Sequence, residues 1–187
     1  YDGKPLPGTS VRAVDWDGRT RLAINGPTLM TRYLDAESPF FDEGGHRWLL
    51  TGDLGIIRAS GTVEVRGRAD DVIVSGGLSI APGPVRRAVR SLEGVADAWI
   101  MATPDEKWGH VVTALVVPEQ VPADSLEMAE LGSAVREHTA ARIGRAQAPR
   151  RVVAVEALPY LGFDKVDRAA AAQAAAEASG TEREWVR

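Results

Sequence analysis

The chain has 187 residues, of which 44% are hydrophobic, and it carries a formal net charge of −4 and no cysteine. This composition suits a globular protein, while the lack of cysteine excludes disulfides, thiolate metal sites and cysteine nucleophiles. The negative charge argues against nucleic acid as a partner, and no apolar run approaches the roughly 20 residues that span a bilayer. The sequence opens at Tyr1 without a signal-peptide pattern, so we expect a cytoplasmic protein and a piece of a longer chain.

Residues 1–66 are expected to form short strands joined by turns. Alternating residues in 10–14 and 21–25 flank Asp17-Gly18, which predicts an antiparallel hairpin. A loop is expected at 40–46. Further strands are expected at 47–50, 55–58 and 62–66. This pattern favours a small β-barrel or a β-meander.

The second part of the chain alternates helices with strands. Pro84 is expected to open a helix that carries Val85, Ala88 and Val89 on one face. Further strands are expected at 95–102, 111–117 and 151–155, and further helices at 126–143 and 168–178. We therefore predict an α+β fold, with a β-barrel subdomain at 1–69 and an α/β domain at 70–187.

Two motifs near the predicted boundary carry carboxylates. Thr51-Gly52-Asp53 is expected to end a strand in a glycine turn, where Asp53 could accept hydrogen bonds from both hydroxyls of a ribose. The alternative is an ordinary aspartate turn. The segment 67–71 places Arg68 beside Asp70 and Asp71, so it is either a local ion pair or a nucleotide contact followed by a hinge.

Gly76 and Gly77 follow an apolar strand. Glycine allows a positive φ or a close backbone approach to a ligand, although a tight turn explains the pair equally well. The motif is not a phosphate-binding P-loop, because no Gly-Lys-Ser/Thr follows it. The polar loop 105–110 is expected to pack Trp108 onto a sheet. The three histidines, His46, His110 and His138, lack metal-ligand spacing.

Lys165 is one of only three lysines in the chain, and it stands in a turn-prone loop before an alanine-rich helix. A compact ammonium on a flexible stem can follow a developing oxyanion more readily than a guanidinium fork can. The alternative is a lysine that is merely solvated on a loop.

Together these motifs resemble the C-terminal portion of the adenylate-forming enzymes, the acyl-CoA synthetase superfamily. The blocks that carry the resemblance occur in the family's order: 51–55, 67–73, 75–77, Leu158-Pro159 and 165–168. Upstream, 5–11 and 26–34 are also similar to this family. Within it, the chain looks most like the o-succinylbenzoate–CoA ligases of menaquinone biosynthesis.

The resemblance implies a ligase that uses ATP and CoA to convert a small carboxylate into an acyl-adenylate and then into a thioester. It implies that Asp53 binds the ribose hydroxyls, that Arg68 assists there, and that Asp70 is the hinge of a mobile C-terminal lid. Lys165 would bridge the carboxylate and α-phosphate oxygens in the first step. Gly76 and Gly77 would face the pantetheine channel in the second.

The sequence departs from the family in several places. The residues before Lys165 are Phe163-Asp164 instead of the usual Ser-Gly, and this carboxylate could pair with the lysine. In 82–87, Pro-Gly-Pro-Val-Arg-Arg replaces an acidic pattern. The family's phosphate loop and its Tyr-Gly-x-Thr-Glu motif, which serves ATP and Mg²⁺, are not in the sequence. We therefore expect the magnesium ligands in a missing N-terminal portion, and little or no activity from this chain alone.

Three interpretations stay open from the sequence. The first is part of an o-succinylbenzoate–CoA ligase. The second is part of a ligase for another aromatic or fatty acid, or an adenylation domain that serves a carrier protein. The third, of another class, is a stand-alone domain without catalytic activity that binds a partner or a nucleotide.

Overall fold

The computed structural model describes residues 2–34, 39–162 and 165–187. The chain divides into two compact units, Tyr1–Asp71 and Val72–Arg187, which we call the N-terminal and C-terminal units. Each is described by itself. Among the described residues, no helix is long and apolar enough to cross a membrane.

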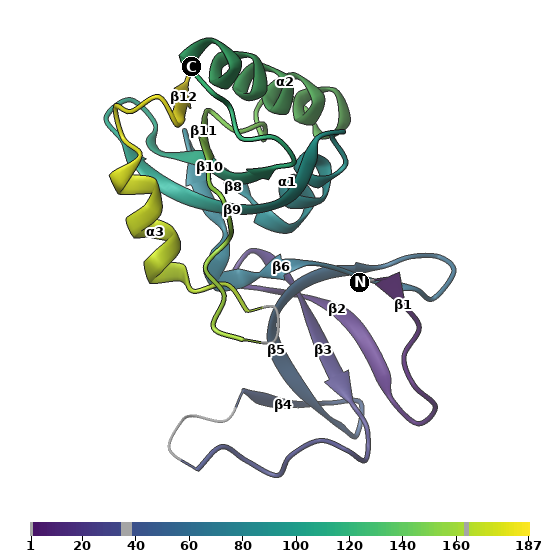
Figure 1. The fold of residues 1–187 in the computed structure, drawn as a ribbon. Coiled ribbons are helices and arrows are strands. Elements are labelled where there is room, and N and C mark those ends of the chain that lie inside the picture. Colours follow the sequence, from purple (N-terminus) through teal and green to yellow (C-terminus); the bar gives the residue numbers. More distant parts are fainter. Residues whose placement is uncertain (1, 35–38, 163–164) are drawn as a thin grey trace. The chain divides into compact units, whose positions relative to one another are not determined.

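The N-terminal unit is a six-stranded antiparallel sheet, ordered β1-β6-β5-β3-β2 with β4 paired to β5 (Figure 1). Its elements are β1 (Asp2–Gly3), β2 (Ser10–Trp16), β3 (Arg19–Asn25), β4 (Phe40–Glu43), β5 (His46–Ile57), β6 (Val63–Arg68) and the 3₁₀ turn η1 (Ala69–Asp71). The hairpin around Asp17-Gly18 is as expected, and both turn residues have positive φ. Because the described strands pair along an open path from β1 to β2, closure into a barrel stays a prediction.

Two sequence-based expectations for this unit are wrong. Residues 40–46 do not form a loop, because Phe40–Glu43 is strand β4 and the Gly44-Gly45 pair, with φ of 61° and 76°, turns it into β5. Nor does Thr51-Gly52-Asp53 end a strand. It lies inside β5, which continues to Ile57. Gly52 therefore does not form a turn but allows the close approach of the Arg68 side chain.

The C-terminal unit is built on a mixed sheet of order β12-β11-β10-β9, in which only the β10–β11 pair is parallel. Its elements are β7 (Ile73–Ser75), β8 (Leu78–Ile80), α1 (Pro82–Arg90), β9 (Val95–Asp105), β10 (Gly109–Pro118), α2 (Ser125–Ile143), β11 (Arg151–Ala154), α3 (Arg168–Glu177) and β12 (Glu184–Val186). Helix α1 begins at Pro82 and not at Pro84 as expected. Proline suits this position because the first turn of a helix has no intrahelical partner for its N–H groups.

Helices cover both faces of this sheet. Figure 1 shows α1 and α2 on one side and α3 on the other. Along β10, Val112 and Val116 point into the core shared with α1 and α2, while Leu115 points into the core shared with α3. This alternation is the period-two pattern of a strand, in which successive side chains point to opposite faces of the sheet. Every second residue of β10 therefore faces the same layer of helices. The buried face of α3 is made of alanines, whose small side chains let the helix lie close to the sheet.

Candidate active site

Asp53 and Arg68 face each other across the β5–β6 pair, where their Cα atoms are direct partners. Arg68 Nη1 lies 3.8 Å from Asp53 Oδ1, and Arg68 Nη2 lies 3.4 Å from Asp70 Oδ2. The side chains of Arg68 and Asp53 are 52% and 39% exposed, so they can contact a ligand as well as each other. The structure therefore brings together three of the residues that the sequence singled out.

Because Gly52 has no side chain, it leaves room beside β5 for the guanidinium group of Arg68. A Cβ at this position would lie 2.6 Å from Arg68 Nη2, which is too close for a larger residue unless the arginine moves. The neighbouring Thr51 hydroxyl donates to the Leu22 carbonyl over 2.8 Å and accepts from the Asp53 N–H over 3.1 Å. These contacts fix the backbone from which the Asp53 carboxylate projects.

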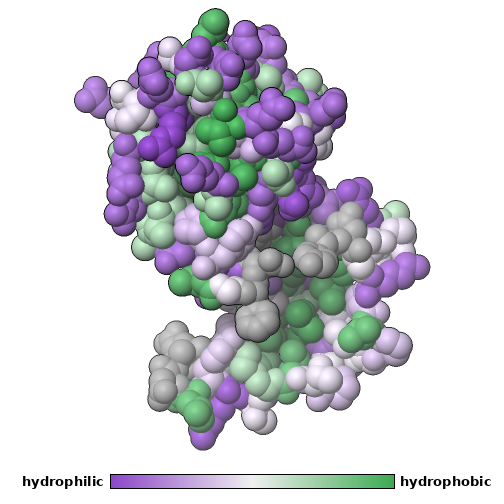
Figure 2. Space-filling view, viewed as in Figure 1, coloured by the Kyte–Doolittle hydropathy of each residue, from purple (hydrophilic) through white to green (hydrophobic). Residues whose placement is uncertain are grey.

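A depression of about 270 Å³ lies next to Asp53 on the N-terminal unit. Apolar side chains of the three strands β2, β3 and β6 line it, together with Thr51, Asp53 and Lys4. Those apolar residues are Val11, Leu22, Ile24, Val63 and Val65. In Figure 2 apolar side chains reach the visible surface of this unit. A carboxylate at the edge of an apolar hollow suits a ligand with both a flat ring and hydroxyl groups.

Asp70 and Asp71 belong to η1, at the point where the chain leaves the N-terminal unit. Ala69 is buried, and its carbonyl accepts a 2.7 Å hydrogen bond from Arg19 Nη1. Asp70 is exposed directly after this anchored residue. The backbone is thus anchored at Ala69, and the side chain of the next residue is exposed.

Gly76 and Gly77 form the turn between β7 and β8, with φ of 55° and 80°. A Cβ on Gly76 would lie 2.4 Å from Trp108 Cε3, whereas a Cβ on Gly77 would meet nothing within 4 Å. The Gly76 N–H also donates to the Trp108 carbonyl over 3.1 Å. Trp108 therefore packs the β9–β10 turn against Gly76 in the β7–β8 turn, and Gly77 is left open. Packing of Trp108 onto the sheet itself, as expected from the sequence, stays a prediction.

The loop that carries Lys165 is fixed at its base. Leu158 and Val166 are buried in the core under α3, and Tyr160 forms a β-bridge with Val166. The Leu161 N–H donates to the Lys165 carbonyl over 2.7 Å, while the Lys165 side chain is exposed. The expected pairing of Asp164 with Lys165 lies outside the described residues.

Asp167 ends this loop and begins α3. Its carboxylate accepts hydrogen bonds from the N–H groups of Ala169 and Ala170, which is the usual N-cap arrangement. The base of the lysine loop and the first turn of the helix are therefore one hydrogen-bonded unit.

Residues 87–161 match the model of the AMP-binding enzyme C-terminal domain. This region belongs to that family. A probable 2-succinylbenzoate–CoA ligase of Mycobacterium tuberculosis is 38% identical over 174 residues, which are 91% of this chain and 43% of that protein. The medium/long-chain-fatty-acid–CoA ligase FadD8 of the same species is 34% identical over 183 residues, which are 90% of this chain and 31% of that protein.

Among solved structures, the o-succinylbenzoate CoA synthetase of Bacillus subtilis, in complex with its acyl-adenylate intermediate, superposes with a TM-score of 0.68. Its sequence identity is 29%, and the match covers 88% of this chain and 34% of that one. The chain thus spans less than half the length of these relatives. The predicted resemblance to the C-terminal portion of an adenylate-forming acyl-CoA synthetase is confirmed.

Sequence analysis missed a polar cluster that ties the lysine loop to the AMP-binding C-terminal domain. Tyr160 Oη donates to Asp97 Oδ2 over 2.5 Å, and Asp97 Oδ1 accepts from the Ala98 N–H over 2.7 Å. Arg86 Nη2 and Arg90 Nε lie 3.1 and 3.2 Å from the same Oδ1. Because Tyr160 and Asp97 are 63 residues apart, no local pattern could have indicated the pair.

The electrostatics of this cluster favour an ionised Asp97. Burial alone would raise the pKa of its carboxyl group, but the hydrogen bonds from Tyr160, the Ala98 N–H and Arg86 outweigh burial and lower the pKa below 3.8. The hydrogen bond to Asp97 raises the pKa of the Tyr160 hydroxyl, so the proton stays on the tyrosine. The pair therefore joins an ionised acceptor to a neutral donor over a wide pH range.

We predict that Tyr160→Phe loosens the lysine loop of the AMP-binding C-terminal domain. Loss of a charge-assisted hydrogen bond at a partly exposed site should lower the free energy of unfolding by about 1 kcal/mol. Hydrogen exchange at the Leu161 amide should accelerate as well. Tyr33→Phe, at an exposed tyrosine of the other unit, is the matched control. Equal effects of the two substitutions on loop exchange would contradict the assignment.

The stabilisation that Asp97 provides should depend on pH with a defined sign. Because its folded pKa lies below the unfolded value of 3.8, the stabilisation is present above that value and is lost as the pH falls through the folded pKa. Asp97→Asn should therefore destabilise the chain at neutral pH, and the difference from the wild type should shrink in acid. Urea titrations at several pH values measure this. A difference that stays constant down to strong acid would contradict it.

Proposed function

We propose that this chain is part of an ATP-dependent carboxylate–CoA ligase. In the first step a carboxylate oxygen attacks the α-phosphorus of ATP, and pyrophosphate leaves. In the second, the CoA sulfur loses its proton and attacks the acyl carbon, and AMP leaves. The family of residues 87–161 and the CoA ligases among the relatives support this proposal.

The observation that carries the proposal is the distance along strand β9 between the Lys165 loop and the Gly76 turn. The base of the Lys165 loop is tied to Asp97 near the start of β9, whereas Gly76 packs against Trp108, just beyond the other end. At the rise of an extended strand, Asp97 and Asp105 are roughly 26 Å apart. One orientation of this domain therefore cannot present both features to the same reacting atoms, which suits a lid that serves two steps in turn.

Lys165 is the proposed catalytic residue of the first step. Two anions approach each other there, and charge accumulates on the phosphoryl oxygens. The exposed ammonium of Lys165, on a loop with an anchored base, would bridge the carboxylate and α-phosphate oxygens. A cation fixed in advance stabilises such charge without reorganisation during the reaction.

The N-terminal unit would contribute the nucleotide contacts. We propose that Asp53 accepts hydrogen bonds from the ribose hydroxyls and that Arg68, 3.8 Å from it, assists at the ribose. Asp70 would be the hinge, since it is exposed and directly follows the anchored Ala69. We therefore propose a domain boundary at 69/70, two residues before the division between the compact units after Asp71.

Gly76 and Gly77 would face the pantetheine channel in the second step. Gly77 has open space beside its Cα, and Trp108 forms a wall on Gly76. Mg²⁺ is expected for the family, and we propose that its ligands lie in residues outside this chain. No group of three or more acidic or histidine side chains among the described residues could hold a metal ion.

We propose o-succinylbenzoate as the carboxylate, which would place the complete ligase in menaquinone biosynthesis. The M. tuberculosis and B. subtilis proteins named for this substrate support it. Medium- or long-chain fatty acids are the second candidate, because FadD8 is 34% identical. A substrate panel with the complete ligase decides between them, and no turnover of either acid would contradict both.

Lys165→Ala in the complete ligase should lower the rate of adenylation by about a few hundredfold, because the cation at the phosphoryl oxygens is lost. Thioester formation from supplied acyl-adenylate should be spared. Pyrophosphate release and CoA consumption measure the two steps separately. Lys107→Ala is the matched control, since Lys107 lies on the turn at the other end of β9, and its adenylation rate should not change. Equal losses in both steps for Lys165→Ala would count against the role.

Asp53→Asn should raise the KM for ATP by about tenfold, because an amide accepts the ribose hydroxyls less strongly than a carboxylate does. With 2′,3′-dideoxy-ATP, which lacks both hydroxyls, the variant and the wild type should have similar KM values. Asp42→Asn, at an exposed position of β4, is the control. If the Asp53→Asn penalty were the same for both nucleotides, the ribose contact would be ruled out.

A further inference from the structure

Asp97 joins helix α1 to the lysine loop within the C-terminal unit. Its Oδ1 lies 3.1 Å from Arg86 Nη2 and 3.2 Å from Arg90 Nε, which both belong to α1. Its Oδ2 accepts the 2.5 Å hydrogen bond from Tyr160 Oη. One carboxylate oxygen therefore faces the helix and the other faces the loop, so Asp97 links the position of Tyr160 to that of α1.

The arginines of α1 stand in a segment that departs from the family resemblance, because Pro-Gly-Pro-Val-Arg-Arg at 82–87 replaces an acidic pattern. Val85 and Val89 are fully buried in the core shared with the sheet, so α1 presents Arg86 from a fixed backbone. A carboxylate at position 86 would repel Asp97, whereas the arginine attracts it. The departure therefore supplies a cation that holds Asp97 in place.

Tyr160 is connected to Lys165 through the backbone of the loop. It forms a β-bridge with Val166, the residue after the lysine. The N–H of Leu161 donates to the Lys165 carbonyl over 2.7 Å. Tyr160 is 43% exposed, so apolar packing alone does not set the direction of its ring. The hydrogen bond to Asp97 is therefore the contact that orients this side of the loop.

Apolar packing already holds the base of the loop on the domain, because Leu158 and Val166 are 6% and 5% exposed. The Asp97–Tyr160 hydrogen bond adds a direction for the loop between these two anchors. The carboxylate is ionised and the phenol keeps its proton, so the bond persists over a wide pH range. Direction matters for a reacting group, since a displacement of roughly 1 Å can lower a rate by about a hundredfold.

We propose that Arg86, Asp97 and Tyr160 are positioning residues for the adenylation step, which direct the lysine loop and with it the Lys165 ammonium. None of the three has to touch the substrate. The inference rests on the role proposed for Lys165 in a carboxylate–CoA ligase, and it adds that this role needs an arginine on α1 as well as the lysine. Because thioester formation does not use Lys165, the three residues should affect the first step alone.

The test measures both half-reactions in the complete ligase. Tyr160→Phe removes the hydrogen bond, and Asp97→Asn removes the charge that strengthens it, while both preserve the shape of the side chain. We expect each to lower kcat for pyrophosphate release by about tenfold or more, with the KM for ATP unchanged. Arg86→Gln should show the same pattern with a smaller loss, because Arg90 still contacts Asp97. Thioester formation from supplied acyl-adenylate should proceed at the wild-type rate.

The double variant Tyr160→Phe/Lys165→Ala separates a positioning role from a general loss of structure. A residue that acts only through Lys165 has nothing left to position once the ammonium is removed. The double variant should therefore adenylate at the same rate as Lys165→Ala alone, whereas independent effects on the rate would multiply.

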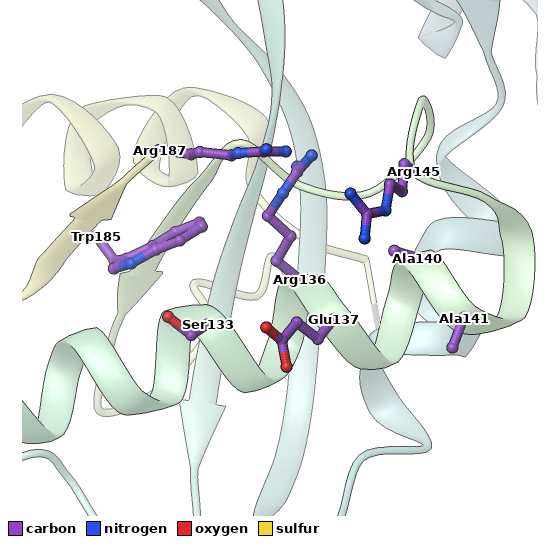
Figure 3. A pocket seen from close by; sticks show the side chains of 8 residues that line it. All are labelled: Ser133, Arg136, Glu137, Ala140, Ala141, Arg145, Trp185 and Arg187. Carbon is purple, nitrogen blue, oxygen red and sulfur yellow. The ribbon is translucent and has the colours of Figure 1, made fainter.

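Two control variants lie in the same domain but outside this cluster. Asp124→Ala removes the N-cap of α2, where Asp124 accepts from the N–H groups of Leu126 and Glu127, so it destabilises the domain without removing a contact of the loop. Glu137→Gln removes an exposed carboxylate of α2, and Figure 3 shows this side chain on the helix beside Arg136. Both should adenylate like the wild type, and circular dichroism verifies that every variant is folded.

The outcomes separate this inference from the proposed function. Adenylation at the wild-type rate by Lys165→Ala would overturn both. If Lys165→Ala is impaired but folded Tyr160→Phe and Asp97→Asn adenylate like Glu137→Gln, only the positioning role is overturned. A double variant much slower than Lys165→Ala, or equal losses in both half-reactions for Tyr160→Phe, would also overturn the positioning role.

Discussion

One rigid strand, β9, sets the constraint on which the proposed function depends. The lysine loop is attached near its first residues, and the glycine turn packs just beyond its last residue. Hydrogen bonds to β10 along almost the whole strand prevent this distance from changing. If one site needs both features, the whole domain has to move between the two steps. This requirement is the reason for proposing a hinge, for which Asp70 is the candidate.

The lysine loop gains its order from two kinds of contact. Leu158 and Val166 bury apolar side chains under α3, which fixes both sides of the loop base. The Tyr160–Asp97 hydrogen bond then sets its direction relative to the sheet. Both contacts leave the Lys165 side chain exposed, so the loop base is fixed while the proposed catalytic side chain projects into solvent.

Local sequence patterns predicted much of the fold, because many turns and helices are specified by residues close together in the sequence. The Asp17-Gly18 turn indicated its hairpin, and helical spacing with strong helix formers indicated α2 and α3. Strand β4 was missed because Phe40–Glu43 shows no alternation and the Gly44-Gly45 pair was interpreted as part of a loop. The short strand β12 was missed because it forms only by pairing with β11, which is distant in the sequence.

The residues of the candidate site were likewise predicted from the sequence only in part. Motif order was enough to single out Asp53, Arg68 and Asp70, and the structure brings these three together. The role of Gly52 could not be predicted, since it depends on the path of the Arg68 side chain from the next strand. The Asp97–Tyr160 pair joins distant segments, so only a three-dimensional structure could indicate it.

The most direct test of the account measures the movement of the C-terminal domain itself. This chain has no cysteine, so spin labels can be attached at Asp42→Cys and Lys107→Cys, which are exposed positions of the two units. Electron–electron double resonance on the complete ligase, with other cysteines removed, then gives the distance between them. The account predicts non-overlapping distance distributions for ligase with ATP and carboxylate and for ligase with a stable acyl-adenylate mimic and CoA. A single distribution shared by both states would contradict it.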